Sequence, residues 1–593
     1  MTRGHRILAA LCVGAGLLGL PGAAAAAPTG ATLGRDVGAL LDRTARQWAG
    51  MTTAGGMFAN PFPADAARGH GAFVPPMLAY ALHRAGQRTG DGRLIAAAER
   101  AWPRAVDPAR ASAFDLVGAA YAYRSVTLSE ERRAQLADYL SRYGIPPTGH
   151  ACLVVPTCYG NLRLVDALAV LTITAAGVRS ADPAARLADP VLARTAALRV
   201  VDEQVPHVVD HGLRARVAGK RTRGSYLSDP LMNPLAYHAL SAFALSEALE
   251  QLGPGASPAA RRAQRETLDA LAVLVAPDGD ATWFGRGQAQ VWVPAVVVAA
   301  MADGARGDPV RAGRYLAVAR RALARLRRLH AGAQGLQLVP GSAARTTTDG
   351  IDGYAHAVAY NGLALFALTE ALDALDAVPA TPIGRLPSAH RLVVRDAGAS
   401  GLAVVGNGKL WLAVSRKPRA VADLRFDSGA LAIKRRTPRG WVDLLAPRPL
   451  APLPPNTGGP ALLRRGRIFP LSAFDIRARD RTITIDGGYR TARRWVWRGR
   501  FRWTLRRSGV RLAVRGERPG AVLRMLAYTP SGTGASGRRW LRAAGATWRF
   551  DRPIRAVRIR GYHSAPVEHL DAIEARFTVP RSGRVAVTIG PGT

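Results

Sequence analysis

The segment Asp349-Gly350-Ile351-Asp352-Gly353-Tyr354 leads directly into the apolar stretch Tyr354–Leu375, whose periodicity predicts a helix. Two other junctions have the same form. Asp278-Gly279-Asp280, followed by Trp283, precedes a second apolar helix, and Gly224-Ser225-Tyr226 precedes a third. Glycine, acidic and aromatic residues therefore recur just before apolar helices. This recurrence indicates a degenerate helical-hairpin repeat that presents polar and aromatic residues at one end of a domain.

Apolar residues at helical spacing, interrupted by Gly, Pro and Asp, run from Thr32 to Val378. The predicted helices are Leu33–Trp48, Val74–Ala85, Gly92–Val106, Ala113–Tyr123, Ser129–Tyr143, Asn161–Ala176, Pro190–Val205, Pro234–Leu252, Ser257–Val275, Gly287–Ala302, Pro309–His330 and Tyr354–Leu375. About twelve helices in six hairpins are expected to close into an (α/α)6 toroid, with the loops lining a central cleft.

The pattern changes after Pro379–Pro387, where short alternating or β-branched segments separated by Gly, Pro, Asn and Asp begin. The predicted strands are Arg391–Val394, Leu402–Val405, Leu410–Val414, Thr482–Ile485, Trp495–Trp503, Val510–Val514, Thr547–Phe550, Ala556–Ile559 and Val585–Ile589. Such segments are typical of an antiparallel β-sandwich. The predicted fold class is α+β multidomain, an N-terminal (α/α)6-type helical toroid followed by an antiparallel β-sandwich domain.

Length and composition agree with this organisation. A chain of 593 residues with 48% apolar and 21% charged residues has material for two to four packed domains, which excludes a disordered or collagen-like protein. Arg3 and Arg6 precede the apolar segment Ile7–Leu20 and the small-residue segment Gly22–Ala27, the pattern of a secretory signal peptide. We expect a signal peptide at 1–27, a toroid at 28–380, a basic β domain at 381–593, and no transmembrane segment.

Two cysteines remain beyond the signal peptide, Cys152 and Cys158. In a secreted protein, two cysteines this close together favour one small disulfide-closed loop. A metal site needs further ligands beside them, and the sequence shows none. No cofactor is predicted, because phosphate-binding loops, His-Glu-x-x-His and nucleophile-elbow motifs are all missing. Calcium is conceivable in the Asp-rich loops, but no loop has the ligand spacing that argues for it.

The charge is unevenly distributed. The net charge is +39, and from Arg385 onward the chain has 42 basic and 12 acidic residues, a net +30. A secreted protein with this field is expected to adhere to polyanionic cell-wall polymers or acidic polysaccharide, and to bind nucleic acid only nonspecifically. The expected location is extracellular, with association to the cell wall as one option. The alternative is that much of the charge only solubilises the surface.

A longer motif surrounds the third junction. It reads Arg223-Gly224-Ser225-Tyr226-Leu227-Ser228-Asp229, followed by Asn233-Pro234-Leu235-Ala236-Tyr237-His238. This stretch resembles the heparinase II/III-like and alginate-lyase polysaccharide lyases, which pair an (α/α) toroid with an antiparallel β domain. Those families have a Gly-Ser-Tyr-type loop that runs into a Tyr-His helix start. Arg223 stands where they usually have Asp.

The resemblance implies a secreted enzyme that cleaves an acidic, uronate-containing glycan by β-elimination. It assigns proton transfer to Tyr237, with His238 beside it, and neutralisation of the substrate carboxylate to Asn161, which lies 76 residues earlier. The chemistry independently requires such groups, since donors must stabilise the enolate-like charge before a base removes the proton. Asn161, Arg286 and Gln288 are suitable donors. A tyrosine acts as base only where positive neighbours favour its phenolate, which Arg286 and Arg345 can provide.

A second wall of the cleft is expected from the last predicted helix. His356 is a further catalytic candidate, and it shares a helix face with Tyr360, four residues later. The candidate substrate-binding residues are Tyr226, Asp229, Asp280, Trp283, Arg286, Gln288, Asp352, Tyr354, Tyr360 and Asn361.

Each candidate also has a structural interpretation. Tyr237 can be a core tyrosine, His238 points about 100° away from it around the helix, and Asn161 can be an N-cap. The helix of His356 and Tyr360 can simply pack against its neighbours, and Trp283 is as easily a core tryptophan as a sugar-stacking platform.

Two other functions stay open. A toroid glycoside hydrolase uses two carboxylates, for which Asp229, Asp280 and Asp352 are candidates. A non-catalytic protein would use the basic β domain to adhere to polyanions. Product chemistry separates the first from the lyase, because elimination leaves an unsaturated sugar and hydrolysis a saturated end.

Overall fold

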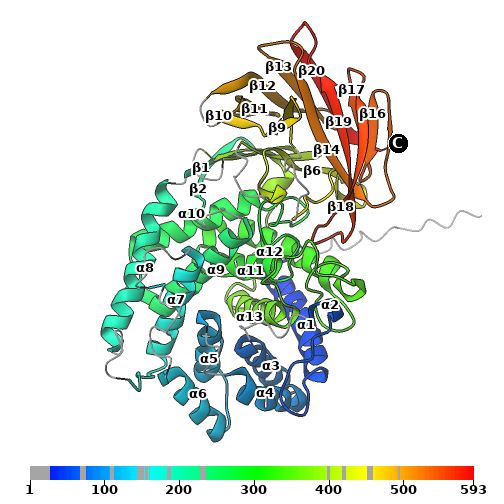
Figure 1. The fold of residues 1–593 in the computed structure, drawn as a ribbon. Coiled ribbons are helices and arrows are strands. Elements are labelled where there is room, and N and C mark those ends of the chain that lie inside the picture. Colours follow the sequence, from blue (N-terminus) through cyan, green and yellow to red (C-terminus); the bar gives the residue numbers. More distant parts are fainter. Residues whose placement is uncertain are drawn as a thin grey trace, which may run out of the picture.

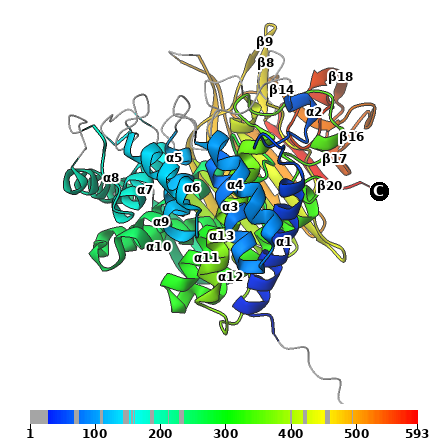
Figure 2. The same ribbon diagram turned by 90° about the horizontal axis from the view of Figure 1, so that it is seen from below.

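The computed structural model describes residues 27–66, 75–106, 112–142, 152–153, 158, 160–182, 189–210, 212–227, 235–396, 401–416, 423–450, 459–491 and 494–592. The helices gather at one end of the molecule and the strands at the other (Figures 1 and 2). Most of the predicted signal peptide, residues 1–26, and the candidate Asp229 lie outside the described residues.

Six helices form a closed inner ring in which each helix contacts the next. They are α3 (Pro75–Thr89), α5 (Ala113–Ser125), α7 (Gly160–Ala175), α9 (Leu235–Leu252), α11 (Trp292–Gly307) and α13 (Ala357–Asp376). The ring closes because α13 contacts α3. Six outer helices alternate with them along the chain: α1 (Gly30–Gly50), α4 (Gly92–Ala105), α6 (Glu130–Arg142), α8 (Pro190–Asp210), α10 (Pro258–Leu274) and α12 (Pro309–His330). The predicted (α/α)6 toroid is confirmed; one further short helix, α2 (Pro63–Ala66), precedes α3.

The two sets of helices differ in how they are buried. In α4 the buried residues form a single stripe, Leu94, Ala97, Ala98, Ala101, Trp102 and Ala105, which is the pattern of an outer helix. In α13 almost every side chain is buried, as expected for a helix enclosed on all sides. Its length and hydropathy also match those of a membrane span, but 94% of the relevant window is buried inside the toroid. Its apolar character is therefore explained by its place in the ring.

Two predicted helix starts are wrong by a few residues. The helix expected from Gly287 begins at Trp292, and the one expected from Tyr354 begins at Ala357. Gly287 and Ala289 have φ of 79° and 51°, a left-handed conformation that a right-handed helix does not admit. The residues before α11 therefore form a loop, those before α13 also lie outside the helix, and both segments carry several of the candidate site residues.

The strand region has three antiparallel sheets. A seven-stranded sheet has the order β2 (Lys220–Ser225), β1 (Gly212–Val217), β3 (Arg391–Asp396), β4 (Leu402–Asn407), β5 (Leu410–Ser415), β6 (Gly429–Thr437) and β7 (Gly440–Asp443). An eight-stranded sheet has the order β10 (Ser472–Arg479), β11 (Thr482–Arg490), β12 (Trp495–Leu505), β13 (Val510–Gly516), β20 (Arg584–Pro591), β17 (Ala546–Phe550), β16 (Trp540–Ala543) and β15 (Ala535–Gly537). A five-stranded sheet has the order β18 (Arg555–Tyr562), β19 (Leu570–Thr578), β14 (Val522–Pro530), β8 (Ala461–Arg464) and β9 (Arg467–Phe469).

The seven-stranded sheet is the middle layer of the molecule. On one face, Leu412 and Ile433 belong to a core shared with the other two sheets. On the other face, Trp411 and Val404 belong to a core shared with the toroid. Because successive side chains of a strand point to opposite faces, a sheet buried on both sides reads as a continuous apolar run, as β4 and β5 do. The predicted order of a helical region followed by layered antiparallel sheets is confirmed.

A hairpin inside the helical part of the chain was not predicted, and neither were the β6–β7, β8–β9 and β15–β16 hairpins of the later region. The strands β1 (Gly212–Val217) and β2 (Lys220–Ser225) lie between α8 and α9 in the chain, and β1 pairs with β3 of the later region. Gly224 allows this hairpin to approach the toroid, because a Cβ added there would lie 2.6 Å from the backbone nitrogen of Ala270 in α10. The glycine of the Gly-Ser-Tyr motif therefore has a packing role in this fold.

Candidate functional site

A cavity of about 290 Å³ opens where the inner helices begin. Its lining comes from α5, α7, α9, α11 and α13 and from the loops before them. The lining residues are Ser112, Ala113, Phe114, Cys152, Asn161, Leu162, Asp166, Tyr237, Leu240, Arg286, Trp292, Tyr354, Tyr360 and Leu363. A largely aromatic and apolar cavity with a few convergent polar groups is the usual form of a site for a small molecule or a sugar.

Two tyrosines and an arginine meet in this cavity. The Tyr237 hydroxyl donates a hydrogen bond of 2.8 Å to the Tyr354 hydroxyl. The guanidinium carbon of Arg286 lies 4.9 Å from the centre of the Tyr237 ring and 5.8 Å from that of Tyr354, which places a positive charge over both rings. Burial, reinforced by the neighbouring Tyr237, raises the pKa of Tyr354, so this hydroxyl keeps its proton. The structure thus brings together three candidates, Tyr237 from the first turn of α9 and Arg286 and Tyr354 from separate loops.

The aromatic wall continues through α11 and α13. Trp292 packs edge-on against Tyr237 at 5.6 Å between ring centres, and Tyr360 lies 5.9 Å from Trp292. Tyr360 therefore lines the cavity on the side formed by α13, as predicted, and Phe114 of α5 also belongs to the lining.

The first turns of α7 contribute two polar side chains. Asn161 lies inside the helix that begins at Gly160, and its buried Oδ1 has no hydrogen-bond partner among the described residues. Asp166 accepts a hydrogen bond of 2.9 Å from the backbone N–H of Cys152, which forms the predicted disulfide with Cys158. Burial raises the pKa of Asp166 to about 7. A carboxyl group that titrates near neutral pH in a cavity is a candidate proton donor or acceptor.

Asp166 was not predicted from the sequence. It lies within Leu164-Val165-Asp166-Ala167-Leu168, where the surrounding apolar residues indicated only a buried helix. The available signal was the carboxylate itself, since an isolated acidic residue inside an apolar helix is rarely buried without a purpose.

His238 and Tyr226 lie together outside the cavity lining. His238 Nδ1 accepts a hydrogen bond of 3.0 Å from the Leu227 N–H, and its ring stacks on Tyr226 at 4.6 Å. Burial lowers the pKa of His238 to about 3, so the ring is neutral. The angular separation expected of neighbouring helix residues thus points Tyr237 into the cavity and His238 away from it.

His356 and Asn361 likewise have partners elsewhere. His356 precedes α13 as its N-cap residue, with Nδ1 3.4 Å from Oδ1 of Asp65. Although burial favours the protonated form of Asp65, hydrogen bonds from His356 and the Ala357 N–H lower its pKa. The Asn361 amide is bonded on both sides, accepting from Trp48 and donating to the carbonyl oxygens of Leu336 and Ala357.

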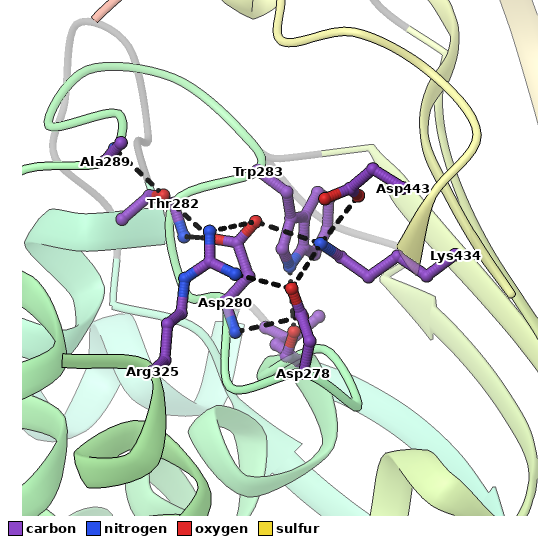
Figure 3. A network of polar contacts seen from close by, with 9 residues as sticks. Asp278, Asp280, Thr282, Trp283, Ala289, Arg325, Lys434 and Asp443 are labelled. Carbon is purple, nitrogen blue, oxygen red and sulfur yellow. Dashed lines mark hydrogen bonds and ion pairs between the residues drawn. The ribbon is translucent and has the colours of Figure 1, made fainter. Parts of the chain in front are cut away.

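Asp280 lies at the junction between the toroid and the middle sheet. Lys434 Nζ of β6 lies 2.9 Å from Asp278, 3.3 Å from Asp280 and 2.8 Å from Asp443, while Arg325 of α12 pairs with Asp278 and Asp280 (Figure 3). Burial opposes ionisation of Asp280, but Arg325 and Lys434 outweigh it and lower the pKa of this carboxyl. The Trp283 indole N–H donates to the Leu274 carbonyl oxygen in the same region.

Asp352 has a similar role a short distance along the interface. Arg425 binds both of its oxygens, at 2.7 and 3.0 Å, and the Gly287 N–H and the Gln290 amide donate to Oδ2. Although burial opposes ionisation, these partners hold the pKa of Asp352 below its usual range. Gln288 lines a separate cavity of about 620 Å³ between toroid and sheet, with Asp280 and Trp283.

Among the described residues, one cluster of three acidic side chains has the spacing of a metal site. It consists of Glu247, Glu250 and Asp303. Glu247 is ten residues after Tyr237 on α9, about 15 Å along the helix, so the group is separate from the cavity. Arg306 already pairs with Glu250 and Asp303, and Tyr121 donates to Glu247 at 2.6 Å. Burial also raises the pKa of Glu247 to about 7 and raises that of Asp303, so the cluster favours bound protons over a set of anionic metal ligands.

Comparisons with known proteins find weak similarities of structure only. No protein-family model and no curated protein matches the chain. A cellobiose 2-epimerase from Spirochaeta thermophila has 14% identity and a TM-score of 0.39, with 57% of this chain and 96% of that one covered. A possible member of the GH105 family from Salmonella enterica has 15% identity and a TM-score of 0.38, with 60% and 97% covered. An inactive variant of an alpha-1,6-mannanase from Salegentibacter has 10% identity and a TM-score of 0.33, with 57% and 99% covered. Similarities of this extent establish no activity for this chain.

Proposed function

We propose that this protein is a secreted carbohydrate-active enzyme that cleaves a uronate-containing glycan by β-elimination in the toroid cavity. The observation that carries the proposal is the Tyr237–Tyr354 hydroxyl pair beneath the Arg286 guanidinium. Elimination needs a base, an acid and a cation that stabilises charge on the substrate carboxylate, and these three side chains are in contact within one cavity.

Substrate binding would use the aromatic wall and the polar end of the cavity. The rings of Trp292, Tyr360 and Phe114 offer apolar surface on which a sugar ring can stack. Arg286 and the Asn161 amide are placed to bind the uronate carboxylate, and neutralising it makes the adjacent C–H more acidic. The Asn161 amide N–H would donate to that carboxylate, and its buried, unpartnered Oδ1 could accept a hydrogen bond from a sugar hydroxyl.

Proton transfer would be divided between the two tyrosines. Tyr237, as phenolate beside Arg286, takes the proton from the carbon next to the carboxylate. The C–H electron pair forms the new C=C bond as the bond to the glycosidic oxygen breaks, and the Tyr354 hydroxyl protonates that oxygen. The proton on Tyr237 then passes to Tyr354 along the existing hydrogen bond, which restores the starting pair.

Hydrolysis is the second candidate, and Asp166 favours it. A carboxyl group with a pKa of about 7 suits a general acid, although a hydrolase of the usual kind needs a second carboxylate nearby. The loop aspartates expected to serve, Asp280 and Asp352, are held in ion pairs at the domain junction. A purely adhesive protein remains the third possibility, and the experiment below separates all three.

The test is to incubate the protein with alginate, polygalacturonate and hyaluronan while recording ultraviolet absorbance and reducing ends. Elimination predicts that both rise together. The Tyr237→Phe and Tyr354→Phe variants should each lose activity by roughly 10²–10⁴-fold. Tyr226→Phe is the matched control, since this buried tyrosine lies outside the cavity lining, and it should keep activity within about threefold. Reducing ends without absorbance would support hydrolysis, and no signal in either channel on any of the three polymers would count against an enzyme of uronate glycans.

A further inference from the structure

The outer face of the eight-stranded sheet is rich in exposed arginine. Five adjoining strands, β12, β13, β20, β17 and β16, contain eight arginines and no aspartate or glutamate. All eight are exposed, while the alternate residues of the same strands are buried in the sheet core. These residues, named here the arginine face, are Arg498, Arg500, Arg502, Arg511, Arg515, Arg542, Arg549 and Arg584.

This positive charge is not balanced within the fold. Within the described ranges, Arg500 is the only one of the eight in an ion pair, with Asp486 of β11 at 2.6 Å. The register places Arg515 directly opposite both Arg500 and Arg584. Like charges directly opposed on neighbouring strands destabilise a sheet. The row of Arg500, Arg515 and Arg584 is therefore electrostatically unfavourable, and a bound anion would remove this repulsion.

A second row of cross-strand neighbours on the arginine face combines arginine with threonine and tryptophan. Thr504, Arg511, Thr588, Arg549 and Trp540 are consecutive cross-strand partners from β12 to β16. Neighbouring strands are about 4.8 Å apart, so the row extends over about 19 Å of the sheet surface. Trp540 at its end is 38% exposed, which is unusual for a side chain of that size. The row thus alternates hydroxyl groups with guanidinium groups and ends on an open indole.

We infer that the arginine face binds an extended anionic polysaccharide. Guanidinium groups pair with carboxylates or sulfates, threonine hydroxyls bond to sugar hydroxyls, and a tryptophan ring offers a platform for the apolar side of a sugar. A duplex nucleic acid would use only the charges, because its bases are paired and cannot stack on one indole at the surface. This site is distinct from the toroid cavity and does not depend on the reaction proposed there.

The test measures binding of hyaluronan and of double-stranded DNA by the full chain at low salt, in the Tyr237→Phe background so that turnover does not consume the probe. Arg511→Ala combined with Arg549→Ala should weaken hyaluronan binding by about tenfold or more. The matched control removes two exposed toroid arginines, Arg35→Ala with Arg43→Ala, and so keeps the same net charge. It should change the affinity by less than about twofold.

Trp540→Ala separates the two classes of ligand. It should weaken hyaluronan binding and leave DNA binding unchanged. The inference is overturned if the parent does not bind hyaluronan, if the control pair weakens binding as much as the Arg511/Arg549 pair, or if Trp540→Ala affects both probes or neither.

Discussion

The toroid cavity and the domain junction both bury aspartates, but they shift the pKa of these aspartates in opposite directions. Asp166 in the cavity and Asp352 at the junction are 6% and 4% exposed, so burial alone does not distinguish them. The pKa of Asp166 is raised to about 7, whereas that of Asp352 is lowered. The difference comes from Arg425, which binds both oxygens of Asp352, while Asp166 has one backbone N–H. A buried carboxylate with an arginine partner stays ionised and makes the loss of that partner costly, whereas one without a charged partner is available for proton transfer.

The largest effect on stability is expected at the junction. Arg425→Ala leaves Asp352 charged and buried, and should lower the free energy of unfolding by roughly 3–5 kcal/mol. Denaturant titration measures this, with Arg142→Ala as control, since its exposed pair with Asp138 should contribute at most about 1 kcal/mol. Equal losses in the two variants would contradict the role given to the junction.

The stability of the protein is also expected to depend on pH through Asp166. Because the pKa of Asp166 is raised in the folded chain, the folded state binds more protons than the unfolded state between about pH 4 and pH 7. Stability contributed by the protonated form is therefore lost as pH rises through this window. Asp166→Asn, which stays neutral, should be more stable than the parent by roughly 2–4 kcal/mol at pH 8 and show little difference at pH 4.

Thermal unfolding of both proteins at the two pH values checks this. A difference that does not change between pH 4 and pH 8 would mean that Asp166 is ionised throughout, like Asp352.

A smaller effect is expected where the hairpin meets the toroid. Gly224→Ala puts a methyl group 2.6 Å from the Ala270 nitrogen, so β2 and α10 must separate slightly. The expected loss is roughly 1–3 kcal/mol by denaturant titration. Gly50→Ala at the end of α1 is the control, because an added Cβ there meets open space, and it should leave the free energy of unfolding nearly unchanged. Gly219 has equally open space, but its positive φ would add backbone strain to an alanine variant.

The fold and part of the candidate site could be predicted from the sequence. The helices were predictable because their apolar periodicity is a local property, and the toroid followed from the repeated junctions. Tyr237 was found through the resemblance of its motif to the polysaccharide lyases, and Arg286 and Tyr354 were found because loops before alternate helices converge at one end of such a toroid. What the sequence could not show is which loops face the sheet, so Asp280 and Asp352 were grouped with the cavity.

The partners of those aspartates lie far along the chain. Arg425 is 73 residues after Asp352, and Lys434 is 154 residues after Asp280, both in the strand region. No local pattern links such residues, because the contacts exist only where the seven-stranded sheet packs on the toroid. The hairpin β1–β2 was missed for a similar reason, since its alternation of arginine with small residues is a weak strand signal.

The most direct test of the central claim is the mass of the products that the protein releases from a uronate polysaccharide. Elimination in the cavity predicts unsaturated products that lack the added water, formed by the parent and lost in Tyr237→Phe. Products that contain the added water, formed equally well by Tyr237→Phe and abolished by Asp166→Asn, would contradict elimination by the tyrosine pair and assign the cavity to hydrolysis.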